Sequence, residues 1–447
     1  MILVKSPCLS SKVGGHLSRD GCCTHPTKKN KNETTLRATT LTMLPHKTHS
    51  IVVDSGTFST KAGFSGDESP QLVLKSVLGK VENDTTTFFG DDLDVRRDRL
   101  ALHSPFRNGL VCRWDIMESI WDQLFQRLSV NSKDTTVLLA EPSHNARVIR
   151  EKHTELLFEK KGIRSLFMGK SAAWSCYANA RGTGVVLDSG GGSTSVCTVA
   201  EGYVLPKSII RDNISGRTLD KITLELLSKR RDVKQFYPKY SYQKTVQADG
   251  STRIEPTSEF DSRTHKSYRD YMLMELGREI RESFCVCSHE KFDLRTNSNI
   301  PSKRYRLPDN TTINIGTERF LVPELMFNPT LHEISQSSVP VHTMILMSIE
   351  KCGEQRLRKE LFGNLIVTGG NTAYEGFKER VEREITLRAA NSLRSKVVGG
   401  SSKTSKCQFT PWMGGSILGS MDSFEKMFIT KKEYEECGAS VVGRKCP

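Results

Sequence analysis

One short pattern occurs twice in this chain, and few folds have a use for two copies of it. Residues 51–60 read IVVDSGTFST and residues 185–194 read VVLDSGGGST. Each copy is a short apolar run that ends in Asp-Ser-Gly and continues with small and hydroxylated residues. An apolar run of this length followed by a glycine-containing turn is typical of a buried strand. We therefore expect two buried strands that end in the same kind of turn.

Other apolar runs extend this expectation to the whole chain. Residues 137–140 and 365–368 read as buried strands, and residues 146–160 read as a helix. Strands that alternate with helices indicate an α/β architecture. The chain has 447 residues, which is enough for about two or three domain-sized units.

Three stretches lack apolar periodicity. Residues 1–49 are polar and basic and predict a disordered N-terminal extension. Residues 232–265 predict a long surface loop or insertion, and residues 397–408 predict a second irregular segment. The formal net charge of +14 favours nucleic acid or other acidic partners, although a solubilising surface charge explains it equally well.

Membrane and metal functions are disfavoured. No run approaches the roughly 20 apolar residues that span a bilayer, and the apolar start MILV is too short for a secretory signal. By elimination we expect the protein in the nucleus or cytosol. The 12 cysteines are scattered, as is typical of reduced thiols. Cys285, Cys287 and His289 invite a metal site, but the surrounding pattern predicts a helix, on which residues two apart do not face each other.

The Asp-Ser-Gly pattern also carries chemistry. Each buried strand delivers an aspartate, Asp54 or Asp188, into a turn whose glycine lets backbone N–H groups face an anion. Such an aspartate suits a divalent cation held through water beside nucleotide phosphates. Two such turns, with their aspartates 134 residues apart, can hold one polyphosphate from opposite sides. A third strand and double-glycine turn, VTGGNTAYEGF at residues 367–377, would let a flat adenosine ring approach the backbone.

These elements, in this order, resemble the actin superfamily, and actin more closely than the sugar kinases or the heat-shock ATPases. The stretches that carry the resemblance are DSGTFSTKAGFSGDESP at residues 54–70, GVVLDSGGGST at 184–194, EGYVLPKSIIRDNISGRTL at 201–219 and WMGGSILGSMDSFEKMFITKKEYEECG at 412–438. The resemblance implies an actin-like α/β fold with two lobes around a nucleotide cleft. It places lobe 1 at residues 50–180, completed by 405–447, and lobe 2 at residues 181–404.

Further stretches are similar to the nuclear actin-related protein 4 class of this family. They are SPFRNGLV at residues 104–111, KHTELLFEKKGI at 152–163, KSYRDYM at 266–272, GGNT at 369–372 and the ending RKCP. The likeness implies a non-filamentous subunit of chromatin-remodelling or histone acetyltransferase complexes, located in the nucleus. It also implies two partners, an actin monomer and a helical scaffold segment of a remodelling ATPase or acetyltransferase complex, with any nucleosome or DNA contact indirect.

The implied cofactor is ATP with Mg²⁺, and Asp54 and Asp188 would support the Mg²⁺ through water. The i, i+3, i+4 spacing of Arg278, Arg281 and Glu282 places them on one helix face beside the adenosine, although an exposed charged face is an open alternative. The residues that the resemblance assigns to the nucleotide are Asp54, Ser55, Gly56 and Lys61 in the first turn, Asp188, Ser189, Gly190 and Gly192 in the second, Arg278, Arg281 and Glu282 on the helix, and Gly369, Gly370 and Tyr374 beside the base.

The chain departs from the actin pattern at five positions. Phe58 stands where the first turn has a glycine, and Gly191 stands where the second has an aspartate. Ser171 replaces the glutamine that positions the attacking water, and Ser195 replaces a histidine near that water. Gln408 falls where a lysine usually flanks the adenine. We therefore expect weakened nucleotide binding and little or no hydrolysis, and we predict no catalytic residue.

Two other functions remain open. An active ATPase or sugar kinase of the same superfamily is disfavoured by Ser171, by Ser195 and by the actin-type C-terminal stretch. A cytoskeletal filament former, or a filament regulator, is disfavoured because only seven residues, VENDTTT, separate Lys80 from Phe88. Actin carries a longer loop there that grips the next subunit, and an open filament needs such a repeated contact.

Overall fold

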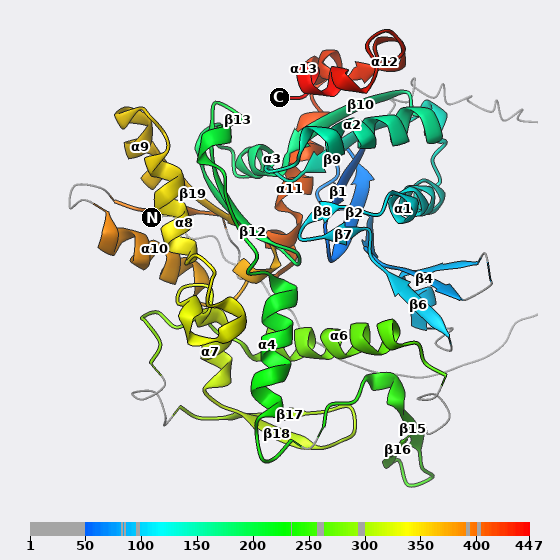
Figure 1. Ribbon diagram of the computed structural model, residues 1–447, viewed down its shortest axis with the longest axis vertical. Helices are drawn as coiled ribbons and strands as arrows, with labels where there is room; N and C mark the ends of the chain where they lie inside the picture. Colours follow the sequence, from blue (N-terminus) through cyan, green and yellow to red (C-terminus); the bar gives the residue numbers. More distant parts are fainter. Residues whose placement is uncertain are drawn as a thin grey trace, which may run out of the picture. The chain divides into compact units, whose positions relative to one another are not determined.

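The computed structural model describes residues 50–81, 84, 86–94, 99–233, 235–256, 263–293, 300–389, 394–399 and 404–447 (Figure 1). All of these residues belong to one compact unit, Lys47–Pro447. The predicted disordered extension, residues 1–49, lies outside the described residues. The two largest sheets have six strands each, and each contains one copy of the repeated pattern.

The first large sheet contains the first copy. Its central strands β1, β9 and β10 are parallel, and β2 pairs antiparallel with β1. The predicted strands at residues 51–53 and 137–140 are confirmed, and all of their side chains are buried. In spatial order the strands are β21 (Ile429–Thr430), β10 (Ser165–Lys170), β9 (Thr136–Glu141), β1 (Ile51–Ser55), β2 (Ser59–Phe64) and β3 (Leu72–Lys75).

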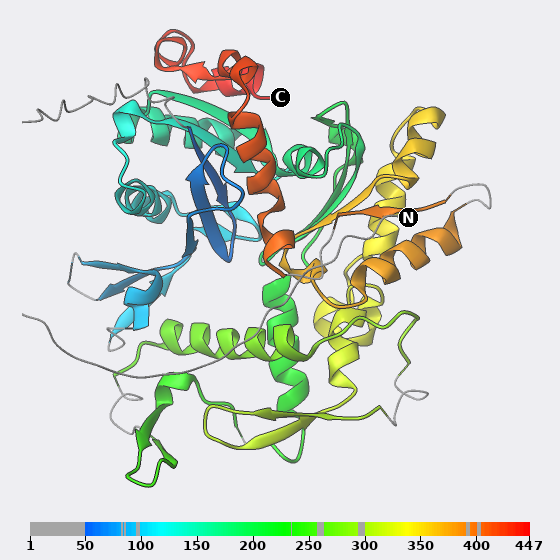
Figure 2. The ribbon, with the colours of Figure 1, turned by 180° about the vertical axis from the view of Figure 1, so that it is seen from behind.

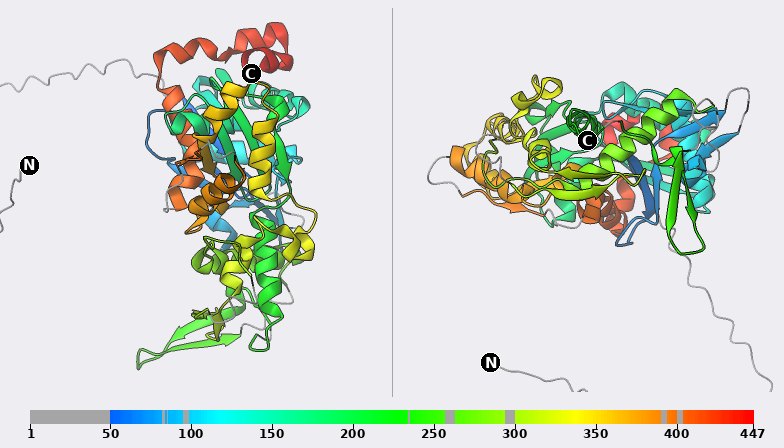
Figure 3. Two further views of the ribbon diagram at one scale, coloured as in Figure 1. Left: turned by 90° about the vertical axis from the view of Figure 1, so that its left-hand side faces the viewer. Right: turned by 90° about the horizontal axis from the view of Figure 1, so that it is seen from below.

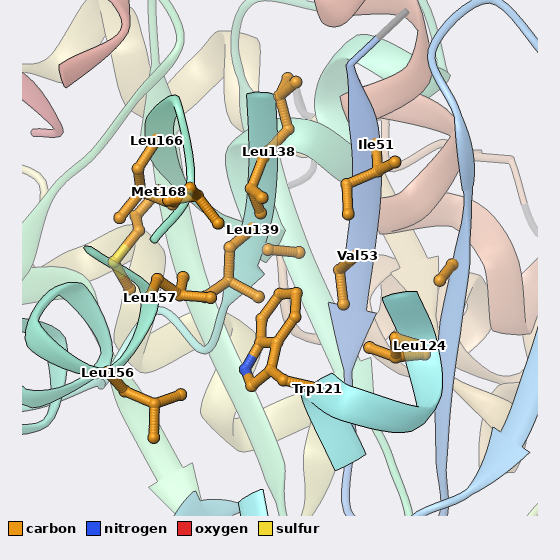
Figure 4. Close-up of a cluster of buried hydrophobic side chains, with 14 of the residues drawn as sticks. Ile51, Val53, Trp121, Leu124, Leu138, Leu139, Leu156, Leu157, Leu166 and Met168 are labelled. Atoms are coloured by element: carbon orange, nitrogen blue, oxygen red, sulfur yellow. The ribbon is translucent and has the colours of Figure 1, made fainter. Parts of the chain in front are cut away.

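Helix α1 and the π-helical turn that follows α2 bury apolar side chains in the core of this sheet. In α1 (Trp114–Arg127) the buried residues Met117, Ile120, Trp121 and Leu124 follow helical spacing. Figure 4 shows Trp121 beside Leu139 in the core between helix and strands. α2 (Arg147–Glu155) continues into one π-helical turn, Leu156–Lys160, so the helix predicted at residues 146–160 is confirmed.

The second large sheet contains the second copy. β11 pairs antiparallel with β12 and parallel with β19, and both predicted strands, at residues 185–187 and 365–368, are confirmed. Helices α8 (Val341–Glu350), α9 (Gln355–Phe362) and α10 (Phe377–Arg388) share its apolar core. The strands are β13 (Tyr203–Val204), β12 (Thr194–Ala200), β11 (Gly184–Ser189), β19 (Leu365–Thr368) and β20 (Val397–Val398) in spatial order, with β14 (Ile210–Asp212) paired to β12.

Two helices join the sheets. α3 (Ser171–Ala178) leads from β10 to β11, and α11 (Thr404–Gly419) passes back beside it (Figure 2). A Cβ on Gly414 would lie only 2.5 Å from the carbonyl carbon of Trp174 in α3, so glycine permits this close packing. The prediction of an irregular segment at residues 397–408 is wrong in part, because it contains β20 and the start of α11. The predicted lobe boundaries remain a prediction.

A small sheet borders the long helix α6. The sheet packs on α6 through a buried apolar cluster that includes Leu100 and Tyr268, and the Leu102 N–H donates to Ser267 Oγ at 2.8 Å. The helices nearby are α4 (Gly216–Ser228) and α6 (Lys266–Phe284). The sheet consists of β5 (Thr87–Phe89), β4 (Leu78–Val81) and β6 (Leu100–His103), and the pair β7 (Phe106–Arg107) and β8 (Leu110–Val111) follows.

The polar interval at residues 232–265 is not only a loop. It contains the hairpin β15 (Tyr242–Val246) and β16 (Thr252–Pro256), which extends away from α4 and α6 (Figures 1 and 3). The remaining described strands and α-helices are β17 (Lys303–Arg306), β18 (Thr312–Ile315), α7 (Glu318–Glu324), α12 (Lys431–Cys437) and α13 (Val442–Lys445). Among the described residues, no helix combines the length and apolar character that crossing a membrane requires.

Candidate functional site

The two copies of the repeated pattern fold into matching hairpins. Asp54 pairs with Lys61 across β1 and β2, and Asp188 pairs with Ser195 across β11 and β12. The turns close in the same way, since the Gly56 N–H donates to the Ser59 carbonyl at 3.2 Å and the Gly190 N–H donates to the Ser193 carbonyl at 3.0 Å. The repetition in the sequence is therefore a repetition of backbone structure.

A hydroxyl pair lies behind each turn. Ser55 Oγ and Thr60 Oγ1 are 3.1 Å apart, and Ser189 Oγ and Thr194 Oγ1 are 2.7 Å apart. All four side chains are buried. Their hydrogen bonds close each hairpin at its root, because buried hydroxyl groups need a partner.

Both turns border one cavity with a volume of about 230 Å³. Two of the predicted nucleotide residues, Ser189 and Tyr374, do not line the cavity. Ser189 is fully buried behind its turn, and the Tyr374 hydroxyl accepts a hydrogen bond from Arg281, which does line the cavity. The predicted residues that do line the cavity are Asp54, Ser55, Gly56, Lys61, Asp188, Gly190, Gly192, Arg278, Arg281, Glu282, Gly369 and Gly370. Residues far apart in the sequence thus converge on one site.

The two turns touch each other at their tips. A Cβ on Gly192 would lie 2.8 Å from the backbone nitrogen of Gly109 and 2.9 Å from Thr57 Cβ. Such distances leave no room for a side chain at position 192. Glycine at this position is required by the approach of the first turn.

The two aspartates have different partners. Lys61 Nζ lies 3.2 Å from Asp54 Oδ2, and both side chains are largely buried. Asp188 has no ion-pair partner in the described part of the chain. Burial, and after it the nearby Asp54 carboxylate, raises the pKa of Asp188 to about 6, and Lys61 opposes the rise. A cation between the two carboxylates would relieve this repulsion.

Asn371, which the sequence analysis did not assign to the site, connects three walls of the cavity. Its Nδ2 donates to Ser189 Oγ at 3.1 Å and to the Gly190 carbonyl at 3.0 Å, and its Oδ1 accepts from Arg281 at 3.3 Å. The turn that holds it depends on Gly369, which has a φ of +90°. The asparagine in the GGNT stretch was the sequence feature that could have identified this role, because a side-chain amide can donate two hydrogen bonds and accept another at the same time.

Helix α6 contributes two arginines to the cavity, one buried and one closer to the surface. Arg281 is buried, donates to Asp220 Oδ1 at 2.6 Å and to the Tyr374 hydroxyl at 2.6 Å, and so is not part of an exposed face. Arg278 lies closer to the surface and donates to Glu282 Oε2 at 3.0 Å. The alternative of an exposed charged face is therefore wrong for Arg281, while the adenosine role of all three residues remains a prediction.

The five departures from the actin pattern all line the cavity. They are Phe58, Gly191, Ser171, Ser195 and Gln408. The ring centroid of Phe58 lies 4.7 Å from Cζ of Arg278, within the range of a cation–π contact. The ring therefore connects the first turn to helix α6.

Two further cavity residues, Glu141 and His144, escaped the sequence analysis. Glu141 Oε1 lies 2.8 Å from Arg150 Nε and 2.9 Å from Lys170 Nζ. Burial lowers the pKa of His144 to about 4, so its ring is neutral at physiological pH. Both ring nitrogens of His144 are buried and lack a hydrogen-bond partner among the described residues. No signal in the single sequence marks either residue.

The metal alternative at Cys285, Cys287 and His289 finds no support. Helix α6 ends at Phe284, so the helix predicted around these residues is wrong. Within the described ranges, no group of three or more His, Cys, Asp or Glu side chains is arranged to hold a metal ion.

The donor set fits a magnesium-bound nucleotide, with one restriction. The two turns and the carboxylates of Asp54 and Asp188 offer what phosphates and a divalent cation require. A cavity of about 230 Å³ is small, however, since pockets for drug-sized ligands range over roughly 300–1,000 Å³. A nucleotide therefore fits only if part of it lies outside this volume or a lining side chain moves.

The sequence of this chain is similar to those of known proteins. The model of the Actin family matches residues 46–447. Actin-related protein 4 of Oryza sativa subsp. indica and that of subsp. japonica are each 34% identical over 441 residues, which cover 89% of this chain and 98% of the relative. Actin-related protein 4 of Arabidopsis thaliana is 34% identical over 438 residues, with the same coverage. The predicted actin-like α/β fold is confirmed, and the chain belongs to the actin family.

Proposed function

We propose that this chain is a non-filamentous nuclear actin-related protein that holds Mg-ATP with little or no hydrolysis. It would serve as a structural and regulatory subunit of chromatin-remodelling or histone acetyltransferase complexes. Its family and its similarity to proteins named Actin-related protein 4 support the general assignment. The observation that carries the nucleotide part is the convergence of both Asp-Ser-Gly turns on one cavity.

The loss of hydrolysis follows from what the cavity wall lacks. In phosphoryl transfer, positioning and electrostatic stabilisation supply nearly all of the catalysis. Ser171 and Ser195 line the cavity at the positions where the resemblance expects a glutamine and a histidine beside the attacking water. A serine is too short to orient that water as a glutamine does. Loss of one oriented contact commonly costs on the order of a hundredfold in rate.

The bound nucleotide would act as a folding ligand. The turns of β1–β2 and β11–β12 belong to different sheets, so a ligand held by both stabilises their relative position. A ligand that binds only the folded state raises stability by mass action. The nucleotide is thus proposed as a structural cofactor.

The test measures unfolding temperature and phosphate release on the same protein, with and without Mg-ATP. We expect a higher unfolding temperature with millimolar Mg-ATP and phosphate release near background. Rapid, steady turnover that Asp188→Ala abolishes would contradict the loss of hydrolysis. An unchanged unfolding temperature would contradict the holding of nucleotide.

The proposed partners are an actin monomer and a helical scaffold segment. By resemblance the scaffold would bind near residues 412–418, where Trp412 is buried and donates to the Val52 carbonyl while Ile417 is 46% exposed. Affinity purification with mass spectrometry tests this, and co-purification with cytoplasmic cytoskeletal proteins alone would overturn it. Sedimentation under polymerising conditions tests the absence of filaments; part of the loop on which that expectation rests, residues 82, 83 and 85, lies outside the described residues.

A further inference from the structure

Phe58 is held in the cavity wall by contacts on two sides. Its ring stacks on the Arg278 guanidinium at 4.7 Å. Arg278 is itself fixed, because Glu275 Oε2 accepts from it at 2.9 Å and Glu282 Oε2 at 3.0 Å. The aromatic ring therefore rests on a guanidinium that has little freedom to move.

The other side of Phe58 meets the second turn. A Cβ on Gly191 would lie 3.0 Å from Phe58 Cβ, 3.5 Å from its backbone nitrogen and 3.7 Å from its Cα. These neighbours are main chain or Cβ, so rotation of the Phe58 side chain cannot move them away. An aspartate at position 191 would be crowded by any residue at position 58 except glycine.

The two departures are therefore coupled. By resemblance the first turn has lost a glycine and gained a ring, while the second has lost an aspartate and gained a glycine. We propose that Phe58 and Gly191 act as a matched pair that sets how tightly the cavity holds a nucleotide polyphosphate. Phe58 weakens binding because its ring lines the cavity, leaves only about 230 Å³ free and engages Arg278, which lines the same cavity. The inference rests on the proposed function, since it concerns the strength of that same site.

The test separates the ring from the Cβ of residue 58. Phe58→Ala removes the ring and keeps the Cβ, whereas Phe58→Gly removes both. Each is combined with Gly191 and with Gly191→Asp. Titration calorimetry gives the Mg-ATP affinity, and the denaturant midpoint without nucleotide gives the stability of each protein.

We expect Phe58→Ala and Phe58→Gly to tighten Mg-ATP binding at least tenfold. Gly191→Asp should lower the denaturant midpoint in the wild-type and Phe58→Ala backgrounds, and much less in the Phe58→Gly background. In that last background it should also strengthen the Mg²⁺-dependent part of the affinity, because the added carboxylate faces the cavity. Phe236→Gly, at a partly buried phenylalanine outside the cavity, is the control for loss of a ring, and Gly353→Asp, where a Cβ has no neighbour within 4 Å, is the control for the added carboxylate.

The outcomes separate this inference from the proposal that it deepens. If wild type binds Mg-ATP and removal of Phe58 does not tighten it, the inference is wrong and the proposed nucleotide site stands. If Gly191→Asp lowers the midpoint equally in all three backgrounds, the pairing is also wrong. If none of the proteins binds Mg-ATP, the proposed function fails, and the role of Phe58 in binding fails with it.

Discussion

The two Asp-Ser-Gly turns share the same backbone hydrogen bonds but carry contrasting side chains at matching positions. Matching positions in the hairpins are Thr57 and Gly191, Phe58 and Gly192, and Lys61 and Ser195. In the first hairpin these side chains make contacts: Lys61 pairs with Asp54, Phe58 stacks on Arg278, and Thr57 packs against the second turn. The second turn consists mainly of glycine, and Asn371 donates a hydrogen bond to its Gly190 carbonyl.

The difference shows what a repeated hairpin retains. Strand pairing and the turn hydrogen bonds involve the backbone, so both copies can keep them whatever side chains follow. The tips of the turns pack against each other, so volume added on one side must be absent on the other. The same sequence pattern thus gives one turn with bulky side chains and one turn of glycines that leaves room for them.

The largest effect should come from adding volume to the bare turn. Gly192→Ala places a methyl group 2.8 Å from the backbone nitrogen of Gly109, which no side-chain rotation can relieve. We expect a loss of about 2–3 kcal/mol in the free energy of unfolding, as for overpacked cores. Gly190→Ala is the matched control, because its nearest neighbour is the Ser193 carbonyl oxygen at 3.8 Å. Equal denaturant midpoints for the two variants would contradict the packing of turn on turn.

The second effect tests the support behind the bare turn. Asn371→Ala removes the two hydrogen bonds to Ser189 and Gly190 and leaves Arg281 without one acceptor. A buried polar group without a partner costs about 1–3 kcal/mol, and we expect about 2 kcal/mol here from denaturant unfolding. Asn364→Ala is the control, since its amide makes one exposed bond of 3.4 Å, to the Glu360 carbonyl. A similar loss in both variants would show that Asn371 gives no special support.

The third effect sets the two aspartates against each other in protein freed of nucleotide and divalent cations. Asp54→Asn should destabilise, because it removes the ion pair with Lys61 at 3.2 Å. Asp188→Asn should stabilise by about 1–2 kcal/mol at pH 7, since a carboxylate with a raised pKa disfavours the folded state once it ionises. The expected gain is smaller than the full rise in the pKa of Asp188 implies, because its side chain is partly exposed and solvent screens its charge.

The pH dependence gives this prediction its sign. Because the pKa of Asp188 rises from an ordinary value of 3.8 to about 6, the folded protein binds more protons than the unfolded chain between these values. The free energy of unfolding therefore falls on this account as pH rises from about 4 to about 6. The gain of Asp188→Asn over wild type should grow through this window and level off above pH 7. A gain that is constant from pH 4 to pH 7 would contradict the role assigned to Asp188.

The parts of the site that the sequence could predict are local in the chain. Asp54 and Asp188 each end a continuous apolar run, and such a run followed by a glycine turn indicates a buried strand wherever it occurs. The two turns lie in different sheets, so strand pairing alone does not bring them together. Their convergence with Gly369 on one cavity was expected from the shared chemistry of the repeated pattern and from the resemblance to the actin superfamily.

The parts that could not be predicted depend on contacts between distant segments. The bond from Asn371 to Ser189 spans 182 residues, and the stacking of Phe58 on Arg278 depends on the side-chain direction. The hairpin β15–β16 was missed because its strands are mostly exposed and polar, so that no apolar alternation marks them. The start of α11 was missed because glycine and serine precede it and suggest a loop.

The smallest effect concerns the hydroxyl pairs at the roots of the two hairpins. Thr194 Oγ1 lies 2.7 Å from both Ser189 Oγ and the Ile214 carbonyl oxygen, and a carbonyl cannot turn to another donor. Thr60 Oγ1 instead lies between Ser55 Oγ and Ser76 Oγ, at 3.1 and 3.0 Å, and these two hydroxyls can rotate to other partners. We therefore expect Thr194→Val to cost about 1 kcal/mol and Thr60→Val about 0.5 kcal/mol. Valine keeps the shape of threonine, so the denaturant midpoints of the two variants compare hydrogen bonds alone. If Thr60→Val were the more damaging, the root of the first hairpin, and not that of the second, would depend on a fixed partner.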